Sequence, residues 1–164
     1  MSVFASSIIT RDEALQQLDD TDCVVCDVLG GAFGEPLIVA RATGCVAVLP
    51  RFAVRRGHAM VALTRHVEHI SELSEDEWLT ACGLARRIAI ALEALMRPLR
   101  CYVASLGTAR GGLPMTSPHV HLHVVPLYDR QDKPSDVFTW ERGVHVATES
   151  EWQKLRVALE RRLA

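Results

Sequence analysis

The chain has 164 residues, of which 49% are hydrophobic, and a formal net charge of −2. A chain of this size can bury one substantial core, so we expect a single domain over residues 1–164. Its 18 lysines and arginines against 20 acidic residues leave no basic excess to neutralise a long run of phosphates, which argues against polymeric nucleic acid as a ligand.

The first part of the chain predicts one short helix and an antiparallel meander. Thr10 is a suitable N-cap for a helix over 11–18. Short segments rich in Val, Ile, Leu and Ala follow, separated by turn-forming or charged residues, and each is expected to form a strand. These segments are 36–41, 44–49 and 58–63.

The middle of the chain predicts one long helix. Ser74 followed by Glu77 is a capping-box pattern, and apolar residues then recur at helical spacing until Pro98 ends the run. Beyond that proline we expect, in order, a strand, a loop rich in glycine and proline, and a last core strand. Their ranges are 101–106, 107–118 and 119–125.

The tail predicts two short strands over 137–140 and 144–146, and a final helix capped by Thr148 with Glu151. Long and short elements of both kinds thus occur along one chain. The expected fold class is α+β, with an antiparallel sheet meander, one long helix and a C-terminal helix.

Neither export nor a membrane span is indicated by the sequence. Residues 1–10 lack a basic flank and a long apolar run, and nowhere do about 18 apolar residues follow one another. Five cysteines make an odd set, which favours thiols or metal ligands over a disulfide framework. The expected compartment is the cytoplasm.

The residues that carry chemistry concentrate in the last predicted core strand. Side chains on a strand alternate between its faces, so His119, His121 and His123 are expected on one side and the apolar residues between them in the core. Such a row favours a site, because each neutral imidazole needs a donor and an acceptor and charging all of them would be self-repulsive. Lone histidines such as His69 and His145 are expected to be ordinary residues.

Two kinds of site compete for these histidines: a metal centre, and a histidine nucleophile flanked by helper groups. Cys23 and Cys26 have the spacing of a metal-binding pair and could complete a tetrahedral zinc site with two histidines. Two buried thiols or a redox pair remain alternatives for the same spacing.

Three blocks of the sequence also occur in the order found in one family. The pattern His-φ-His-φ-His-φ-φ, with φ an apolar residue, is matched over 119–125. A Gly-His pair, an apolar strand and then Arg-His occupy 57–66, and the cysteine pair lies at 23–26. The chain therefore resembles the histidine-triad family of nucleotide hydrolases and transferases. The resemblance implies a HIT-like domain with extensions over 1–22 and 128–164.

The resemblance implies catalytic roles for three histidines. His121, in the middle of the triad, is implied as the nucleophile that attacks the α-phosphorus of a nucleotide and forms a nucleotidyl-histidine intermediate. His123 would supply a hydrogen bond or a proton to the phosphate oxygens or the leaving group. For His58, support of the active site and the role of a plain strand histidine bonded to backbone remain equal alternatives.

The resemblance also implies a structural zinc ion, because zinc-containing members use the cysteine pair with two histidines of the later blocks. Four protein ligands leave no open position for substrate, so the ion would fix the start of the catalytic strand. The implied ligands are Cys23, Cys26, His66 and His119.

For the substrate, the resemblance implies that Thr116 contacts the α-phosphate, with backbone N–H groups near Met115 and Thr116 donating to its oxygens. Ser105 is a candidate that faces the phosphates. Phe52 and Leu49 are candidate walls of the base pocket, and an ordinary core role is the competing interpretation for both.

The sequence departs from the family pattern in several places, among them Leu63 in place of a usual Pro and a longer loop before the triad. Pro50 stands where an Asp commonly holds the ribose hydroxyls, and Met115 stands where a Gln is usual. The tryptophans are expected outside the pocket, with Trp140 and Trp152 in a stretch that could cover the active site of a partner subunit. A homodimer through the long helix and a shared sheet is the family expectation.

Three classes of function follow. The favoured class is a hydrolase or nucleotidyltransferase that acts on a phosphoanhydride, a phosphoramidate or a dinucleoside polyphosphate, with a small AMP-like or dinucleoside polyphosphate substrate. The second is a non-catalytic nucleotide-binding or regulatory protein, which the departures at Pro50 and Met115 leave open and the intact triad argues against. The third, a catalytic metal held by the three strand histidines, ranks last because their first and third Cα atoms would lie about 13–14 Å apart.

Overall fold

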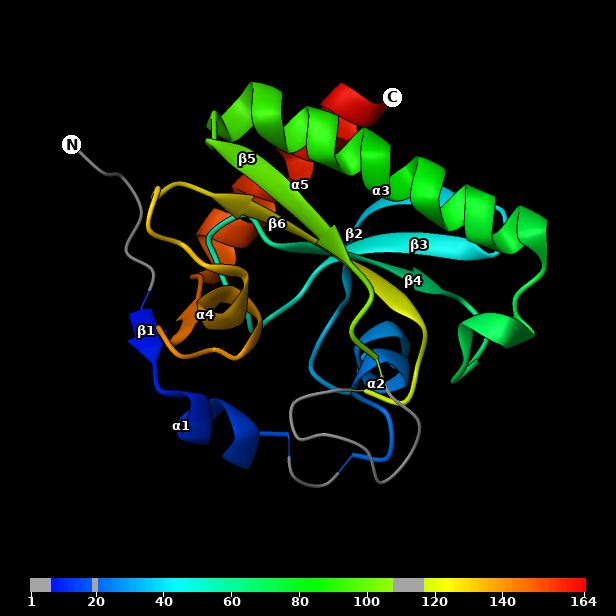
Figure 1. Ribbon diagram of the computed structural model, residues 1–164, viewed down its shortest axis with the longest axis horizontal. Coiled ribbons are helices and arrows are strands. Elements are labelled where there is room, and N and C mark those ends of the chain that lie inside the picture. Colours follow the sequence, from blue (N-terminus) through cyan, green and yellow to red (C-terminus); the bar gives the residue numbers. More distant parts are fainter. Residues whose placement is uncertain (1–6, 19–20, 108–116) are drawn as a thin grey trace.

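The computed structural model describes residues 7–18, 21–107 and 117–164. It contains a five-stranded antiparallel sheet with the strand order β2-β3-β4-β6-β5, one long helix and a C-terminal helix (Figure 1). The predicted α+β class is thereby confirmed. The strands are β2 (Leu37–Ala42), β3 (Cys45–Leu49), β4 (Ala59–Leu63), β5 (Arg100–Ala104) and β6 (His121–Leu127).

Two helices cover one face of this sheet (Figure 1). α3 (Glu75–Met96) begins at the predicted capping box, where the hydroxyl of Ser74 accepts the backbone N–H of Glu77. α5 (Glu149–Leu163) begins at an equivalent box on Thr148. The apolar faces of both helices and the inward side chains of the strands form the main core. Among the described helices, none is long and apolar enough to cross a bilayer.

Shorter elements lie on the opposite face, which is the face that carries the histidines. In Figure 1 they lie below the sheet, away from α3. Because some come from the start of the chain and others from its end, both extensions meet on this side. The elements are α1 (Arg11–Gln16), α2 (Val24–Gly30), α4 (Pro134–Phe138) and a small sheet of β1 (Ser7–Ile9) with β7 (Val144–Val146).

Strand β6 follows the predicted alternation of side chains. Leu122 and Val124 pack in the main core, while His121 and His123 line a cavity on the other side. The strand pairs with β4 on one side and with β5 on the other. Pairing on both sides fixes the positions of the two histidines along the sheet.

Two predicted strand assignments are wrong. Residues 137–140 form the end of α4 and a turn, because Pro134 suits the first turn of a helix. β6 begins at His121 and not at His119. The sequence also gave no indication of α2, for which Cys23 is the N-cap, or of the 3₁₀ turn η1 (Ile70–Glu72) before α3.

Candidate functional site

Three histidines from two neighbouring strands converge on one face of the sheet. His121 and His123 lie on β6, and His58 lies immediately before β4. Nε2 of His58 is 2.9 Å from Nδ1 of His123, and Nε2 of His123 is 3.0 Å from Nε2 of His121. At one end of this row, the backbone N–H of Val54 donates to Nδ1 of His58 at 3.4 Å. At the other end, Nδ1 of His121 lies 2.6 Å from the carbonyl oxygen of His119.

This row of hydrogen bonds has one consistent proton assignment when every ring is neutral. The Val54 N–H must donate, so Nδ1 of His58 accepts and its Nε2 carries the proton. That proton points to Nδ1 of His123, whose Nε2–H then donates to Nε2 of His121. The His119 carbonyl can only accept, so Nδ1 of His121 carries a proton, which agrees with the assignment from the other end. Nε2 of His121 therefore keeps a lone pair.

Burial holds these rings in the neutral form. His58 and His121 are only 2% and 4% exposed. Burial, together with the nearby His121, lowers the pKa of His58 to about 3. Burial also lowers the pKa of His121, although its hydrogen bond to His119 opposes the effect. For His123, burial and the two neighbouring rings hold the pKa well below its ordinary value. All three are therefore imidazoles at neutral pH.

His119 does not share this surface, contrary to the prediction of three imidazoles in one row. It precedes β6, so the alternation of the strand does not govern its side chain. Its Nδ1 lies 3.4 Å from Sγ of Cys26 and 3.6 Å from Sγ of Cys23. Its Nε2 donates to the carbonyl of Leu63 at 3.0 Å. Only the backbone carbonyl of His119 faces His121.

Four side chains that can bind metal meet at the start of α2. Their ligand atoms all lie within 4.8 Å of one another, and they belong to Cys23, Cys26, His66 and His119. Nδ1 of His66 is 3.3 Å from Sγ of Cys26, and its Nε2 is 3.3 Å from the carboxylate of Glu68. In both histidines an oxygen acceptor therefore engages Nε2 and leaves Nδ1 facing the sulfurs. This donor set and its outer hydrogen bonds fit a tetrahedral zinc ion.

The two thiols of this cluster differ in their readiness to ionise. Burial opposes the thiolate of Cys23, but hydrogen bonds with His119 and Ser117 outweigh it and lower the pKa of Cys23 to about 6. Burial and the adjacent Cys23 sulfur raise the pKa of Cys26 to about 11. The protein alone thus favours one negative charge on the pair, and a divalent cation would favour the second.

The face of the sheet that carries His58, His121 and His123 opens into a cavity of about 560 Å³. That volume lies in the range of small-molecule sites. His58, His121 and His123 line it. Its charged lining residues, among those that the structure describes, are Arg11, Arg51 and Glu141. Its aromatic lining residues are Phe33, Phe52, Phe138 and Trp140.

Only one of the predicted substrate residues that the structure describes lines this cavity. Phe52 lines it, whereas Leu49 and Ser105 are absent from the described lining. Leu49 is 2% exposed and packs in the main core, because it faces the α3 side of β3. Ser105 directly follows β5. Thr116 and Met115 lie outside the described residues.

The carboxy-terminal extension supplies cavity residues that the sequence did not predict. Residues 138–141 line the cavity beside the histidines, so the prediction that Trp140 lies outside the pocket is wrong. The ring of Phe138 lies 6.4 Å from that of His123. No local pattern could have indicated this contact, because it depends on how α4 packs against β6.

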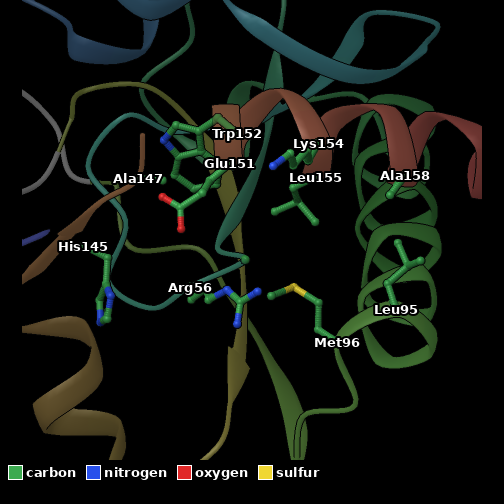
Figure 2. A pocket seen from close by; sticks show the side chains of 11 residues that line it. Arg56, Leu95, Met96, His145, Ala147, Glu151, Trp152, Lys154, Leu155 and Ala158 are labelled. Carbon is green, nitrogen blue, oxygen red and sulfur yellow. The ribbon is translucent and has the colours of Figure 1, made fainter. Parts of the chain in front are cut away.

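A second, smaller cavity of about 200 Å³ lies beside α5. Figure 2 shows Arg56 between His145 and Met96 in the view, with Glu151 and Trp152 above it. None of the predicted site residues that the structure describes lines this cavity. The larger cavity is therefore the candidate substrate site.

Comparison with known proteins gives matches in sequence and in structure. The family model described as HIT domain matches residues 35–130. An uncharacterised HIT-like protein of Saccharolobus solfataricus is 28% identical over 109 residues, which make up 66% of this chain and 76% of that protein.

Several solved structures share the fold. A hypothetical histidine triad nucleotide-binding protein of Sulfolobus tokodaii has a TM-score of 0.65 at 18% identity, over 86% of this chain and 91% of that one. A zinc-bound histidine triad family protein of Mycobacterium smegmatis has a TM-score of 0.61 at 20% identity, over 85% of this chain and 94% of that one. A diadenosine triphosphate hydrolase of Plasmodium falciparum, in complex with cyclomarin A, has a TM-score of 0.58 at 14% identity, over 76% of this chain and 74% of that one. At these identities the likeness shows the fold alone.

Proposed function

This chain belongs to the HIT domain family, and from that membership we propose that it hydrolyses or transfers nucleotides at the α-phosphate through a nucleotidyl-histidine intermediate on His121. The observation that carries the proposal is the position of His121, a buried ring in the wall of the large cavity whose Nδ1 lies 2.6 Å from the carbonyl oxygen of His119. That contact leaves the lone pair on Nε2. Such a ring is nucleophilic at neutral pH. The diadenosine triphosphate hydrolase with the same fold supports this class of substrate.

In the first step, the lone pair on Nε2 of His121 becomes a bond to the α-phosphorus. The bond from phosphorus to the leaving group breaks, and its electron pair departs with that group. The Nε2–H of His123 points at Nε2 of His121 in the free protein and would turn its hydrogen bond to the departing atom, which is oxygen in a phosphoanhydride and nitrogen in a phosphoramidate. The carbonyl of His119 holds Nδ1–H and stabilises the positive charge that the His121 ring acquires.

In the second step, water or another acceptor attacks the phosphorus and the bond to His121 breaks. The electron pair of that bond returns to Nε2, the attacking group loses its proton to solvent, and the ring is neutral again. His58 acts on this cycle through His123, because the donation from its Nε2 fixes the tautomer of that ring. We therefore assign His58 a positioning role.

We also propose that the cysteine–histidine cluster holds a structural zinc ion. The zinc-bound histidine triad family protein with the same fold supports this choice of metal. When bound, zinc would tie the start of α2 to the entry of β6, with all four positions filled by protein. His119 would then be a ligand through its side chain and a hydrogen-bond acceptor through its backbone.

Mass spectrometry of the intact protein tests the nucleophile. The protein is incubated briefly with adenosine 5′-phosphoramidate or a diadenosine polyphosphate and is then mapped under conditions that spare acid-labile adducts. We expect a nucleotide adduct on the peptide that contains His121, and no adduct in His121→Asn. His69→Asn, which replaces an exposed histidine that is not among the described lining residues of the cavity, should behave as the wild type.

The outcomes separate the proposed enzyme from a non-catalytic binding protein. An adduct that persists in His121→Asn would remove this residue from the mechanism. Nucleotide binding without an adduct or turnover would favour the regulatory alternative. The observation behind that alternative is Pro50, which lies in the cavity wall at the position where the family commonly has an Asp.

A further inference from the structure

The carboxy-terminal extension places a tryptophan in the wall of the cavity that holds the histidines. Its aromatic neighbour Phe138 already contacts two other rings, since its ring centroid lies 6.2 Å from that of Tyr102 and 6.4 Å from that of His123. Trp140 is partly buried at the edge of a small cluster that includes Val54. Within the described part of the chain, no aromatic ring packs on the indole of Trp140. A ring in the cavity could therefore stack on it.

The backbone at Trp140 is held in an unusual conformation. Its φ is 59°, in the left-handed region that glycine adopts freely and that bulky side chains rarely adopt. Its carbonyl accepts the N–H of Gly143 at 2.9 Å, which closes the turn. Strained residues of this kind persist where the surrounding structure fixes them, and they cluster at ligand sites.

Ion pairs fix the segment that carries Trp140 to the catalytic side of the sheet. Arg55 pairs with Asp132 at 2.6 Å, and their side chains are only 9% and 4% exposed. Arg142 also pairs with Asp132, at 3.4 Å. Because Arg55 lies three positions before His58 in the chain, the wall and the histidine row are held by adjacent backbone.

We propose that Trp140 is a substrate-contact residue that stacks on the base of the nucleotide whose α-phosphate lies at His121. The inference rests on the proposed function and adds the element that recognises the nucleoside. The indole presents a flat apolar face, and Phe52 and Pro50 add apolar surface to the same cavity. Stacking on an aromatic ring accepts any base and favours the larger purines. The chain thus supplies this wall to its own active site.

Binding of two probes tests the contact: adenosine 5′-monophosphate, which has a base, and ribose 5-phosphate, which lacks one. In calorimetric titrations, Trp140→Ala should weaken binding of the nucleotide by about 5- to 150-fold, the range measured for single aromatic–base contacts. Binding of ribose 5-phosphate should stay within about twofold of the wild type, because it makes no such contact. Trp140→Phe should retain most of the affinity. Trp78→Ala on α3, across the sheet, is the control and should not change the ratio of the two affinities.

A further variant separates the contact from folding. Trp140→Gly and Trp140→Ala remove the same ring, but only glycine fits a φ of 59° without strain. We therefore expect Trp140→Gly to melt a few degrees higher than Trp140→Ala, while both lose the same nucleotide affinity. If the affinity instead followed the melting temperature, the role of Trp140 would be structural.

The outcomes distinguish this inference from the proposed chemistry. Equal effects of Trp140→Ala on both probes, no effect on either, or no binding of the nucleotide by the wild type would each overturn the stacking contact. Binding that depends on Trp140 without any adduct on His121 would support the contact and contradict the proposed reaction. If the adduct formed as efficiently in Trp140→Ala as in the wild type, the proposed reaction would be supported and the stacking contact contradicted.

Discussion

The rings of His58, His121 and His123 lie side by side, and their described hydrogen bonds are to one another and to backbone groups. His58 and His121 are buried, and His123 is partly buried. Each ring has a pKa below the ordinary value of about 6.5. At pH values below about 6.5, these histidines bind more protons in the unfolded chain than in the folded one, so protonation favours unfolding. The contribution of these rings to stability is complete above about pH 6.5. It is lost as the pH falls, down to about 3 for His58.

We therefore predict that the free energy of unfolding decreases by up to about 1.4 kcal/mol per pH unit for each ring below about pH 6.5. Urea titrations at a series of pH values measure this slope. His58→Gln should make it shallower and still form the adduct, because an amide can accept from Val54 and donate to His123 in the same way. His58→Leu should lose most of the adduct. The control is His69→Gln, which should keep the wild-type pH dependence of the free energy of unfolding. If His58→Gln kept it as well, the assignment of His58 as a buried neutral ring would be contradicted.

Gly107 lies where the chain approaches the backbone that supports the nucleophile. A Cβ at this position would lie 2.8 Å from the carbonyl oxygen of His119 and 3.0 Å from that of Ser117. We predict that Gly107→Ala displaces the His119 carbonyl and reduces the turnover number on the order of tenfold or more. The control is Gly83→Ala in α3, where a Cβ meets open space. Wild-type turnover in Gly107→Ala would show that the carbonyl does not position His121.

At the scale of elements, the cysteine–histidine cluster joins the start of α2, the connection after β4 and the entry to β6. We predict that Cys26→Ala loses bound zinc and melts lower, by about 2–4 °C for each kcal/mol that the metal contributes to folding. Metal analysis and thermal unfolding measure both effects. Cys82→Ala on α3 should keep its zinc, since Cys82 lies outside the cluster. Equal zinc contents in the two variants would rule out the proposed site.

Patterns of residues close together in the sequence correctly predicted the helix caps and the alternation of side chains on the last core strand. Ser74 and Thr148 cap their helices as expected, and Leu122 and Val124 face the core as the alternation of a strand requires. α2 has only seven residues, too few for a clear helical period. The place of Trp140 was predicted wrongly because it depends on packing between segments distant in sequence. Family motifs gave the cluster of cysteines and histidines, but not the wall that the tail provides.

At the scale of the whole molecule, β5 is an edge of the five-stranded sheet. Apolar side chains are exposed along this edge and on α3, among them Val103 at 50% and Ile90 at 49%. We propose that two copies pair along β5 and α3, because an exposed apolar edge strand favours pairing with another chain. Val103→Lys should then convert a dimer into a monomer in light scattering after gel filtration. Ile8→Lys, exposed on β1, should not change the mass, and a monomeric wild type would contradict the proposal.

His119 takes part in two sites through different parts of the same residue: its imidazole faces the sulfurs, and its carbonyl holds His121. Every amino acid carries a carbonyl, but only a few side chains can bind a metal. A substitution at this position therefore removes a ligand without removing the acceptor behind the nucleophile. In evolutionary terms, a lineage can lose the cysteine–histidine cluster by point mutation and still inherit the main-chain support for His121, so that the two features can be lost at different times.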